Sequence, residues 1–244
     1  MQALATPLVS ILHGSQAYTF SRRESGGRMH YVPTLASVEE LGRVAPGSVF
    51  EDGRCWEMVP AKYYRYEDRA TYLRERYPLL AEDAIGVIAL PGLEAMALYD
   101  KHPQLPDALR SGNHLAQLLL LVAKTMSEVT PHVCFAFFTS TAVWLTLVRD
   151  KEVILCKAMD MHAHADAVFH LASLLSQYGL SREDTEVVVG GHIAAEGQLY
   201  RELSIYFRLR AFADALGALP EQPALALLLA FQQAISDPIA VSAV

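Results

Sequence analysis

Three histidines and an aspartate lie within nine positions in the segment Met161–His170, which reads MHAHADAVFH. Imidazole nitrogens and carboxylate oxygens are common zinc ligands, and the same groups transfer protons in catalysis. His162, His164 and Asp166 alternate along the chain, so a loop could present all three to one metal ion. The segment is therefore either a metal site or the polar start of a helix.

The order of these residues resembles the HxHxDH motif of metallo-β-lactamase-like hydrolases. In that motif, a loop after a strand offers imidazoles to one zinc ion, and a carboxylate and an imidazole to a second. Ala167 stands at the last position of the motif, and His192 is the only histidine after residue 170. A metal-dependent hydrolase that uses His162, His164 and Asp166 is therefore an alternative function, and the leading hypothesis binds no metal.

The same segment also has the pattern of a capped helix. His164 or Asp166 can cap a helix over 164–178, where negative charge near the N-terminus is favourable. The buried stripe of this helix is predicted to consist of Val168, Phe169, Leu171, Ala172 and Leu175. His170 would then lie near His162 and Asp166 on a partly exposed face.

The elements that position these residues belong to a globular chain. Of its 244 residues, 52% are hydrophobic and 19% are charged, which suits one large domain or two small ones. Twenty basic and 27 acidic residues give a net charge of −7, which argues against nucleic acid as a partner. The apolar runs are too short to span a membrane, no secretory signal is apparent, and the three cysteines lack CxxC spacing. We expect a cytoplasmic protein.

Hydrophobic periodicity divides the chain into two halves that begin alike. The first half predicts three strands as a meander at 8–13, 17–23 and 28–33, a short helix from Ser37 as N-cap to Val44, a helix at 67–77, strands at 84–90 and 94–99, and a long helix at 106–128. The second half predicts strands at 132–138, 141–149 and 152–158, a helix at 164–178, a strand at 186–189 and a helix at 197–216. The apolar stretch 223–235 must be covered by the domain itself or by a second subunit, so a homodimer is possible.

The doubled order and the segments MVPAKYY, LCKAMDMHAHAD and VVVGGHIAAEG carry a family resemblance. The chain is similar to the bacterial family known as domain of unknown function 3822, within the actin-like ATPase superfamily. The resemblance implies an α/β fold with two tandem ribonuclease-H-like units, each a β-meander followed by helix-strand-helix elements. We place these units at 1–128 and 129–244. No family function comes with the resemblance.

For an actin-like ATPase, the resemblance implies an Asp-Gly turn between the first two strands of each half, beneath the phosphates and magnesium. The corresponding turns here read HGSQ at 13–16 and FTST at 138–141, so neither contains a carboxylate. Magnesium that holds a triphosphate needs hard oxygen ligands, usually acidic ones. ATP hydrolysis is therefore not expected.

A second segment matches the nucleotide-binding elements of the superfamily better than the two turns do. VVVGGHIAAEG resembles the adenosine motif of the superfamily, in which paired glycines let a nucleoside approach the backbone, and Gly190 and Gly191 match those positions. A nucleotide site in the cleft expected between the halves would combine Gly190, Gly191, Thr139 and Ser140. The simpler interpretation is a strand-to-helix turn that needs glycine for its backbone angles.

The leading hypothesis is a catalytically silent actin-like protein without a cofactor, which acts as a scaffold or regulatory partner of another protein. Nucleotide binding, with ATP as the ligand, is the alternative, and metal-dependent hydrolysis is a third hypothesis. Cys55 and Cys134 lie beside apolar residues and are expected to be unreactive buried thiols. The run Tyr63-Tyr64-Arg65-Tyr66 is expected to form a lid or an interface strip.

Overall fold

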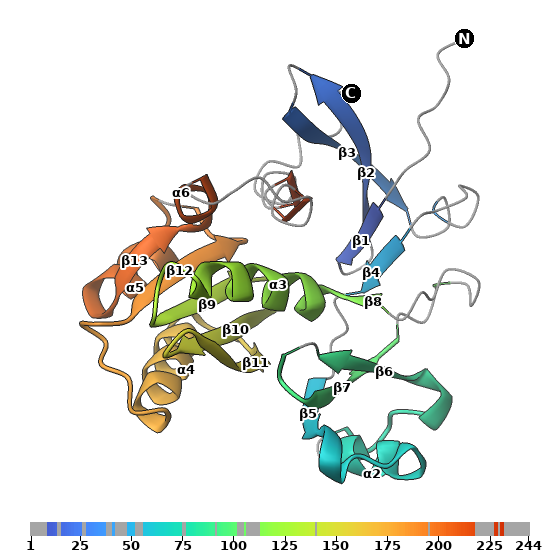
Figure 1. The fold of residues 1–244 in the computed structure, drawn as a ribbon. Helices are drawn as coiled ribbons and strands as arrows, with labels where there is room; N and C mark the ends of the chain where they lie inside the picture. Colours follow the sequence, from blue (N-terminus) through green and yellow to red (C-terminus); the bar gives the residue numbers. More distant parts are fainter. Residues whose placement is uncertain are drawn as a thin grey trace. The chain divides into compact units, whose positions relative to one another are not determined.

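The computed structural model describes most of the chain and separates it into two compact units. The described residues are 9–13, 16–25, 28–37, 41, 48–51, 56–74, 77–90, 92–101, 105, 113–139, 141–194, 196–217, 227–228 and 230–231. Unit 1 comprises Met1–Leu118 and Ala226–Val244, and unit 2 comprises Leu119–Leu225. The fold is mixed α/β with three sheets, as the α/β prediction requires (Figure 1).

The larger sheet of unit 1 begins with the predicted meander. Its strands are β1 (Val9–His13), β2 (Gln16–Ser25), β3 (Arg28–Ser37), β4 (Ser48–Glu51) and β8 (Asn113–His114), in the order β3-β2-β1-β4-β8. The meander is antiparallel, and β4 and β8 add to it in parallel. Ser37, the predicted N-cap, is the last residue of β3 and pairs with Gln16. Residues 38–40 lie outside the described residues, so the cap stays a prediction. Of the helix predicted after it, only Leu41 lies within the described residues, and it is helical.

The apolar C-terminal stretch is covered by unit 1 itself. Its described residues are helical and buried: Leu227, Leu228, Ala230 and Phe231. The Phe231 ring meets the Tyr18 ring edge-on at 5.5 Å between centroids and the Phe20 ring at 6.5 Å. These aromatic contacts pack Phe231 on the core side of β2, so burial of the four described residues needs no second subunit.

A smaller antiparallel sheet completes unit 1. It consists of β5 (Trp56–Pro60), β7 (Ala95–Asp100) and β6 (Ile85–Leu90), in that spatial order, with α2 (Arg69–Arg74) and the 3₁₀ turns η1 (Ala61–Tyr63), η2 (Tyr66–Asp68) and η3 (Glu82–Ala84). The two strands predicted at 84–90 and 94–99 are confirmed. The helix predicted at 67–77 is shorter than expected. Ala70 and Leu73 bury one face of α2 against Val59, Ile85 and Leu98.

The long helix predicted at 106–128 starts later, as α3 (Leu115–Ser127), and 106–112 lie outside the described residues. Asn113 and His114 instead pair with β4, so that part of the prediction is wrong. The Nδ1 atom of the His114 ring accepts a hydrogen bond from the Ala116 N–H over 3.1 Å. The ring therefore caps the first turn of α3. Burial lowers the pKa of His114 to about 3, which keeps this ring a neutral acceptor.

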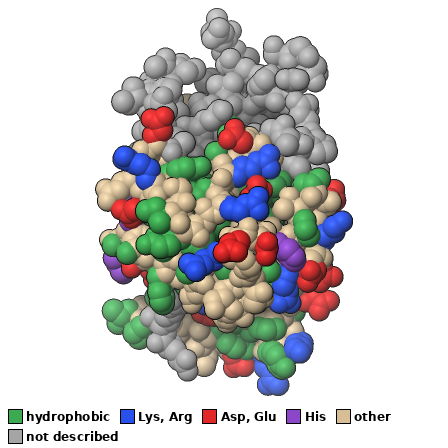
Figure 2. Space-filling view, turned by 90° about the vertical axis from the view of Figure 1, so that its left-hand side faces the viewer, with side chains coloured by type: hydrophobic (Ala, Val, Ile, Leu, Met, Phe, Trp, Pro, Cys, Tyr) green, Lys and Arg blue, Asp and Glu red, His purple; other side chains and the backbone are tan. Residues whose placement is uncertain are grey.

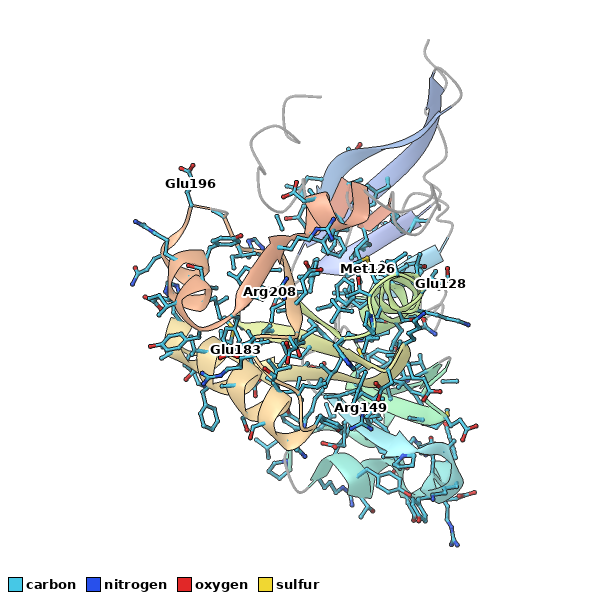
Figure 3. The ribbon with its side chains drawn as sticks, turned by 60° about the vertical axis from the view of Figure 1, so that its left-hand side comes forward. Met126, Glu128, Arg149, Glu183, Glu196 and Arg208 are labelled. Carbon is cyan, nitrogen blue, oxygen red and sulfur yellow. The ribbon has the colours of Figure 1, made fainter. Side chains whose placement is uncertain are left out.

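Unit 2 is built on a second five-stranded sheet. Its strands are β9 (Val133–Phe138), β10 (Ala142–Arg149), β11 (Glu152–Asp160), β12 (Glu186–Gly191) and β13 (Arg208–Ala211), in the order β11-β10-β9-β12-β13. The first three are an antiparallel meander, and β12 and β13 continue the sheet in parallel. All six residues of β9 are buried because α3 and α4 lie on opposite faces of the sheet (Figure 3). The predicted strands of this half are confirmed.

Besides the part of α3 from Leu119 onward, the helices described in unit 2 are α4 (His164–Gln177), α5 (Gln198–Tyr206) and α6 (Phe212–Gly217). The single helix predicted at 197–216 is wrong, since β13 interrupts it. After α5, the apolar residues Phe207 and Leu209 alternate with Arg208 and Arg210, as in a strand. Residues Arg208–Ala211 pair with β12 and do not continue the helix. Arg149 donates to Tyr178 O at the end of α4, and Arg208 donates to Glu183 O (Figure 3). Within the described residues, no helix is both long and apolar enough to cross a bilayer.

Candidate functional site

The paired glycines lie where two parallel strands end. Gly190 and Gly191 close β12 opposite Phe137 and Phe138 of β9. Gly191 has φ +84°, and a Cβ there would collide with the Phe138 carbonyl oxygen and lie 2.8 Å from the backbone nitrogen of the same residue. His192 N then donates to Phe138 O over 2.8 Å. Glycine is therefore required at 191 by both the backbone angle and the close approach of the strands.

The Thr139 hydroxyl forms hydrogen bonds within the turn that follows β9. Its Oγ1 donates to Ala142 O over 3.1 Å and accepts from Ala142 N over 3.0 Å, while its own N–H donates to the same carbonyl over 2.8 Å. Because a hydroxyl has a single proton to donate, a ligand at this turn would find that donor already in use. Thr139 is also buried. Ser140 and the first-half turn residues Gly14 and Ser15 lie outside the described residues.

The loop between β12 and α5 carries one acidic residue, Glu196. Its side chain is exposed and points outward from the tip of the loop (Figure 3). The loop ends at Gly197, the N-cap of α5, which makes no side-chain capping bond. Within the described part of this loop, the one carboxylate therefore points outward.

Asp166 caps α4, as one of the predicted interpretations holds. Its Oδ2 accepts hydrogen bonds from the backbone N–H groups of His162 at 2.7 Å and Ala163 at 2.8 Å. These two bonds lower the pKa of Asp166, the His162 bond most. The carboxylate satisfies the two N–H groups that precede the helix, and it stands where negative charge favours the helix dipole.

The histidines of the same segment have separate partners. His164 Nδ1 lies 3.7 Å from Glu202 Oε2 on α5, and His170 Nε2 is 3.0 Å from Asp160 O at the end of β11. His162 is exposed. Across the described part of the chain, no three His, Cys, Asp or Glu side chains are grouped so that they could hold one metal ion.

Two of the three cysteines lie in the core of unit 2. Cys134 and Cys156 are fully buried, and burial raises the pKa of each thiol to about 12. Both sulfurs therefore stay protonated at neutral pH, which makes them poor nucleophiles. The predicted burial is confirmed for Cys134, and Cys55 lies outside the described residues.

The tyrosine run is partly exposed, as expected for a surface strip. Tyr63 and Tyr66 expose 64% and 62% of their surface. Lys62 Nζ stands 4.8 Å from the centroid of the Tyr63 ring, and the Arg69 guanidinium stands 4.2 Å from that of Tyr66. These cation–π contacts leave one face of each ring already occupied by a neighbour of the same segment.

The sequence reasoning missed a groove between α4 and the outer strands of the sheet. It has a volume of about 140 Å³ and is lined by Leu145, Leu155, Lys157, Met159, Phe169, His170 and other residues near the end of α4. Phe169, predicted to belong to the buried stripe of α4, is 67% exposed. The buried residues are Ala167, Leu171, Leu174 and Leu175. The alternation of Leu155, Lys157 and Met159 was the available signal, because it puts a cation among apolar side chains on one strand face.

Comparison with known families gives a match over most of the chain. The family described as "Protein of unknown function (DUF3822)" matches residues 56–209. The chain belongs to this family. No curated protein matches the DUF3822 chain.

Solved structures show which fold this DUF3822 protein has. A Bacteroides thetaiotaomicron protein with actin-like ATPase fold and unknown function is 11% identical, with 92% of this chain and 96% of that chain covered and a TM-score of 0.71. A chain of a PilM-PilN type IV pilus biogenesis complex is 12% identical, with 91% and 96% covered and a TM-score of 0.50. The cytoplasmic domain of EpsL from Vibrio cholerae is 14% identical, with 91% and 92% covered and a TM-score of 0.41. The likeness to the Bacteroides protein shows that the DUF3822 chain has the actin-like ATPase fold.

Proposed function

We propose that this DUF3822 protein is a non-catalytic member of the actin-like fold class that acts by binding another protein, as a scaffold or regulatory partner. The observation that carries this proposal is the hairpin turn after β9. There the Thr139 hydroxyl bonds to Ala142 of its own turn, and the described turn residues carry no carboxylate. Magnesium triphosphate requires the opposite arrangement, with free donors and acidic oxygens around the phosphates.

The proposal includes two tandem ribonuclease-H-like units, with a boundary near 128 and 129. The two five-stranded sheets support it, because both have an antiparallel meander whose first strand is followed outward by two parallel strands. A protein with this architecture keeps a rigid frame whether or not it holds a nucleotide. Such a protein can act by binding a partner through its surface.

A protein partner is supported by one of the similar structures and by the surface. That structure, at a TM-score of 0.50, is a complex of PilM with a second protein, PilN. On the face drawn in Figure 2, acidic and basic side chains are interspersed with hydrophobic ones, and neither sign forms a continuous field. Such a mixed surface suits recognition of another protein.

A nucleotide at the glycine pair is the second candidate function. It is favoured by the position of Gly190 and Gly191 at the carboxyl ends of two parallel strands, the usual place for ligands in α/β sheets. The N-terminus of α5 follows, without a side-chain cap at Gly197, and could hold an anion. Backbone groups alone would bind the phosphates here.

Calorimetric titration with ATP and magnesium tests the proposal, together with an assay for released phosphate. We expect no heat of binding at about 1 mM nucleotide and no turnover. A nucleotide present at a hundred times its Kd would stabilise the protein by about 2.7 kcal/mol, so thermal unfolding with ATP, ADP and AMP is a sensitive second test. Binding without turnover would favour the second candidate, and turnover would remove the non-catalytic proposal. Stoichiometric zinc or nickel in the untagged protein would return the metal-dependent hydrolase to consideration.

A further inference from the structure

The groove between α4 and β11, here called the α4–β11 groove, lies at the outer edge of the sheet of unit 2. Its floor is formed by Leu145 of β10 with Leu155, Lys157 and Met159 of β11, and Phe169 of α4 forms part of its wall. Phe169 is 67% exposed, so an aromatic ring is available to a bound partner. Residues from one unit alone form the groove.

Strand β11 borders the groove and ends the sheet. It pairs with β10 from Glu152 to Asp160 and, in the strand order of the described residues, has no neighbour on its other side. Half of the backbone N–H and C=O groups of an edge strand point away from the sheet, where they can pair with another extended segment. A short peptide can therefore bind by adding a strand beside β11.

The groove-facing residues of β11 define which peptide fits. Leu155, Lys157 and Met159 alternate on this face, and an added strand places its own alternate side chains beside them. Within the described part of the chain, Lys157 makes no ion pair, and its side chain is half-buried. An ammonium group in that setting favours a carboxylate opposite it, flanked by apolar side chains that lie beside Leu155 and Met159.

We infer that the α4–β11 groove binds an extended peptide segment of a partner protein with the pattern apolar, any residue, acidic, any residue, apolar. This inference rests on the proposed function, since it names the surface through which the protein meets its partner. The pattern reads the same in both chain directions, so it holds for parallel and antiparallel addition. A second copy of β11 cannot supply it, because neither of its acidic residues has an apolar residue two positions away on both sides: Glu152 follows Asp150, and Asp160 precedes His162.

A binding measurement with designed peptides tests the inference. The probe is a fluorescein-labelled peptide with leucine, glutamate and leucine at alternate positions between threonines, and binding is followed by fluorescence anisotropy. Lys157→Glu is expected to weaken binding about tenfold or more, and a peptide with lysine in place of glutamate should restore it to that variant. Phe169→Ala should weaken binding about fivefold, through loss of the apolar wall. N-methylation of alternate peptide nitrogens should abolish binding if the peptide joins the sheet as a strand.

Matched variants elsewhere on the surface serve as controls. Lys124→Glu reverses an exposed lysine on α3, and Ile205→Ala removes an exposed apolar side chain from α5. Both should leave the Kd within about twofold. Absence of saturable binding at about 1 mM peptide overturns the inference, as does binding that ignores Lys157→Glu or N-methylation. These results are separate from ATP turnover, which bears only on the non-catalytic proposal.

Discussion

Two borders of the unit 2 sheet differ in how their polar groups are used. Where β9 and β12 end, the Thr139 hydroxyl and the His192 N–H are bonded to neighbouring backbone, and Gly191 lets the strands close. Along β11, Lys157 has no ion pair among the described residues, and Phe169 is exposed. A group that is satisfied within the fold can bind a ligand only by giving up that bond, so the second border is better suited to recognition.

The largest effect expected from this comparison is the loss of stability in Gly191→Ala. The new Cβ would collide with Phe138 at a backbone angle that favours glycine, so we expect unit 2 to lose about 3 kcal/mol of unfolding free energy. Urea unfolding followed by the fluorescence of buried Trp144, in a Trp56→Phe background, measures it.

Gly179→Ala is the control for backbone strain without a collision. Gly179 has φ +67°, and nothing lies within 4 Å of a Cβ built there, so the loss should be about 1 kcal/mol. Equal losses in the two variants would mean that β12 does not close against β9, and the β9–β12 border would be more open than described.

The next effect is that of Thr139→Ala. Removal of the hydroxyl leaves Ala142 N–H and C=O without their side-chain partner, which should reduce the unfolding free energy by about 1–2 kcal/mol. Thr139→Ser keeps the hydroxyl and should retain most of that stability. If Thr139→Ala instead unfolded like the native protein but lost an ATP-dependent shift in Tm, the hydroxyl would serve a nucleotide and the comparison between the two borders would fail.

The sequence predicts elements well where their signal is local. The runs that became β9, β10 and β11 combine apolar residues with clear turns, and their predicted bounds differ from those observed by no more than two residues. Strands β4, β5, β8 and β13 were missed. Of these, β4, β8 and β13 have at most four residues each and depend on a parallel partner far away in the sequence. Local periodicity carries no information about such pairing.

The candidate site shows the same limit. Asp166 was recognisable as a cap from its spacing to the helix start. The exposure of Phe169 could not be recognised from the sequence. Helical periodicity identifies an apolar stripe, but it does not say how far the neighbouring sheet extends over that stripe. The hydrogen bond from the Thr139 hydroxyl to Ala142 O depends on the geometry of one turn, which residue types alone do not specify.

A smaller effect concerns Asp166 and pH. Hydrogen bonds to the folded carboxylate lower its pKa from the ordinary value of 3.8, so its contribution to stability is fully present above that value and is lost as pH falls through the lowered pKa. Asp166→Ala should therefore have a lower Tm than the native protein at pH 7, and the two should converge below pH 3.8. Glu196→Ala, which removes an exposed carboxylate from a loop, is the matched control. A Tm difference for Asp166→Ala that persists unchanged at acid pH would contradict the capping role.

The smallest effect is expected in the groove, from Phe169→Ala. With 67% of its surface exposed, Phe169 contributes little to the core, and the unfolding free energy should change by less than about 0.5 kcal/mol. Leu171→Ala, two residues along the same helix and fully buried, should instead lose about 2–5 kcal/mol. Urea unfolding of both variants measures the difference between a recognition side chain and a packing side chain. A loss at Phe169 as large as that at Leu171 would mean that the ring is buried in solution, and the α4–β11 groove would then belong to the closed part of the unit.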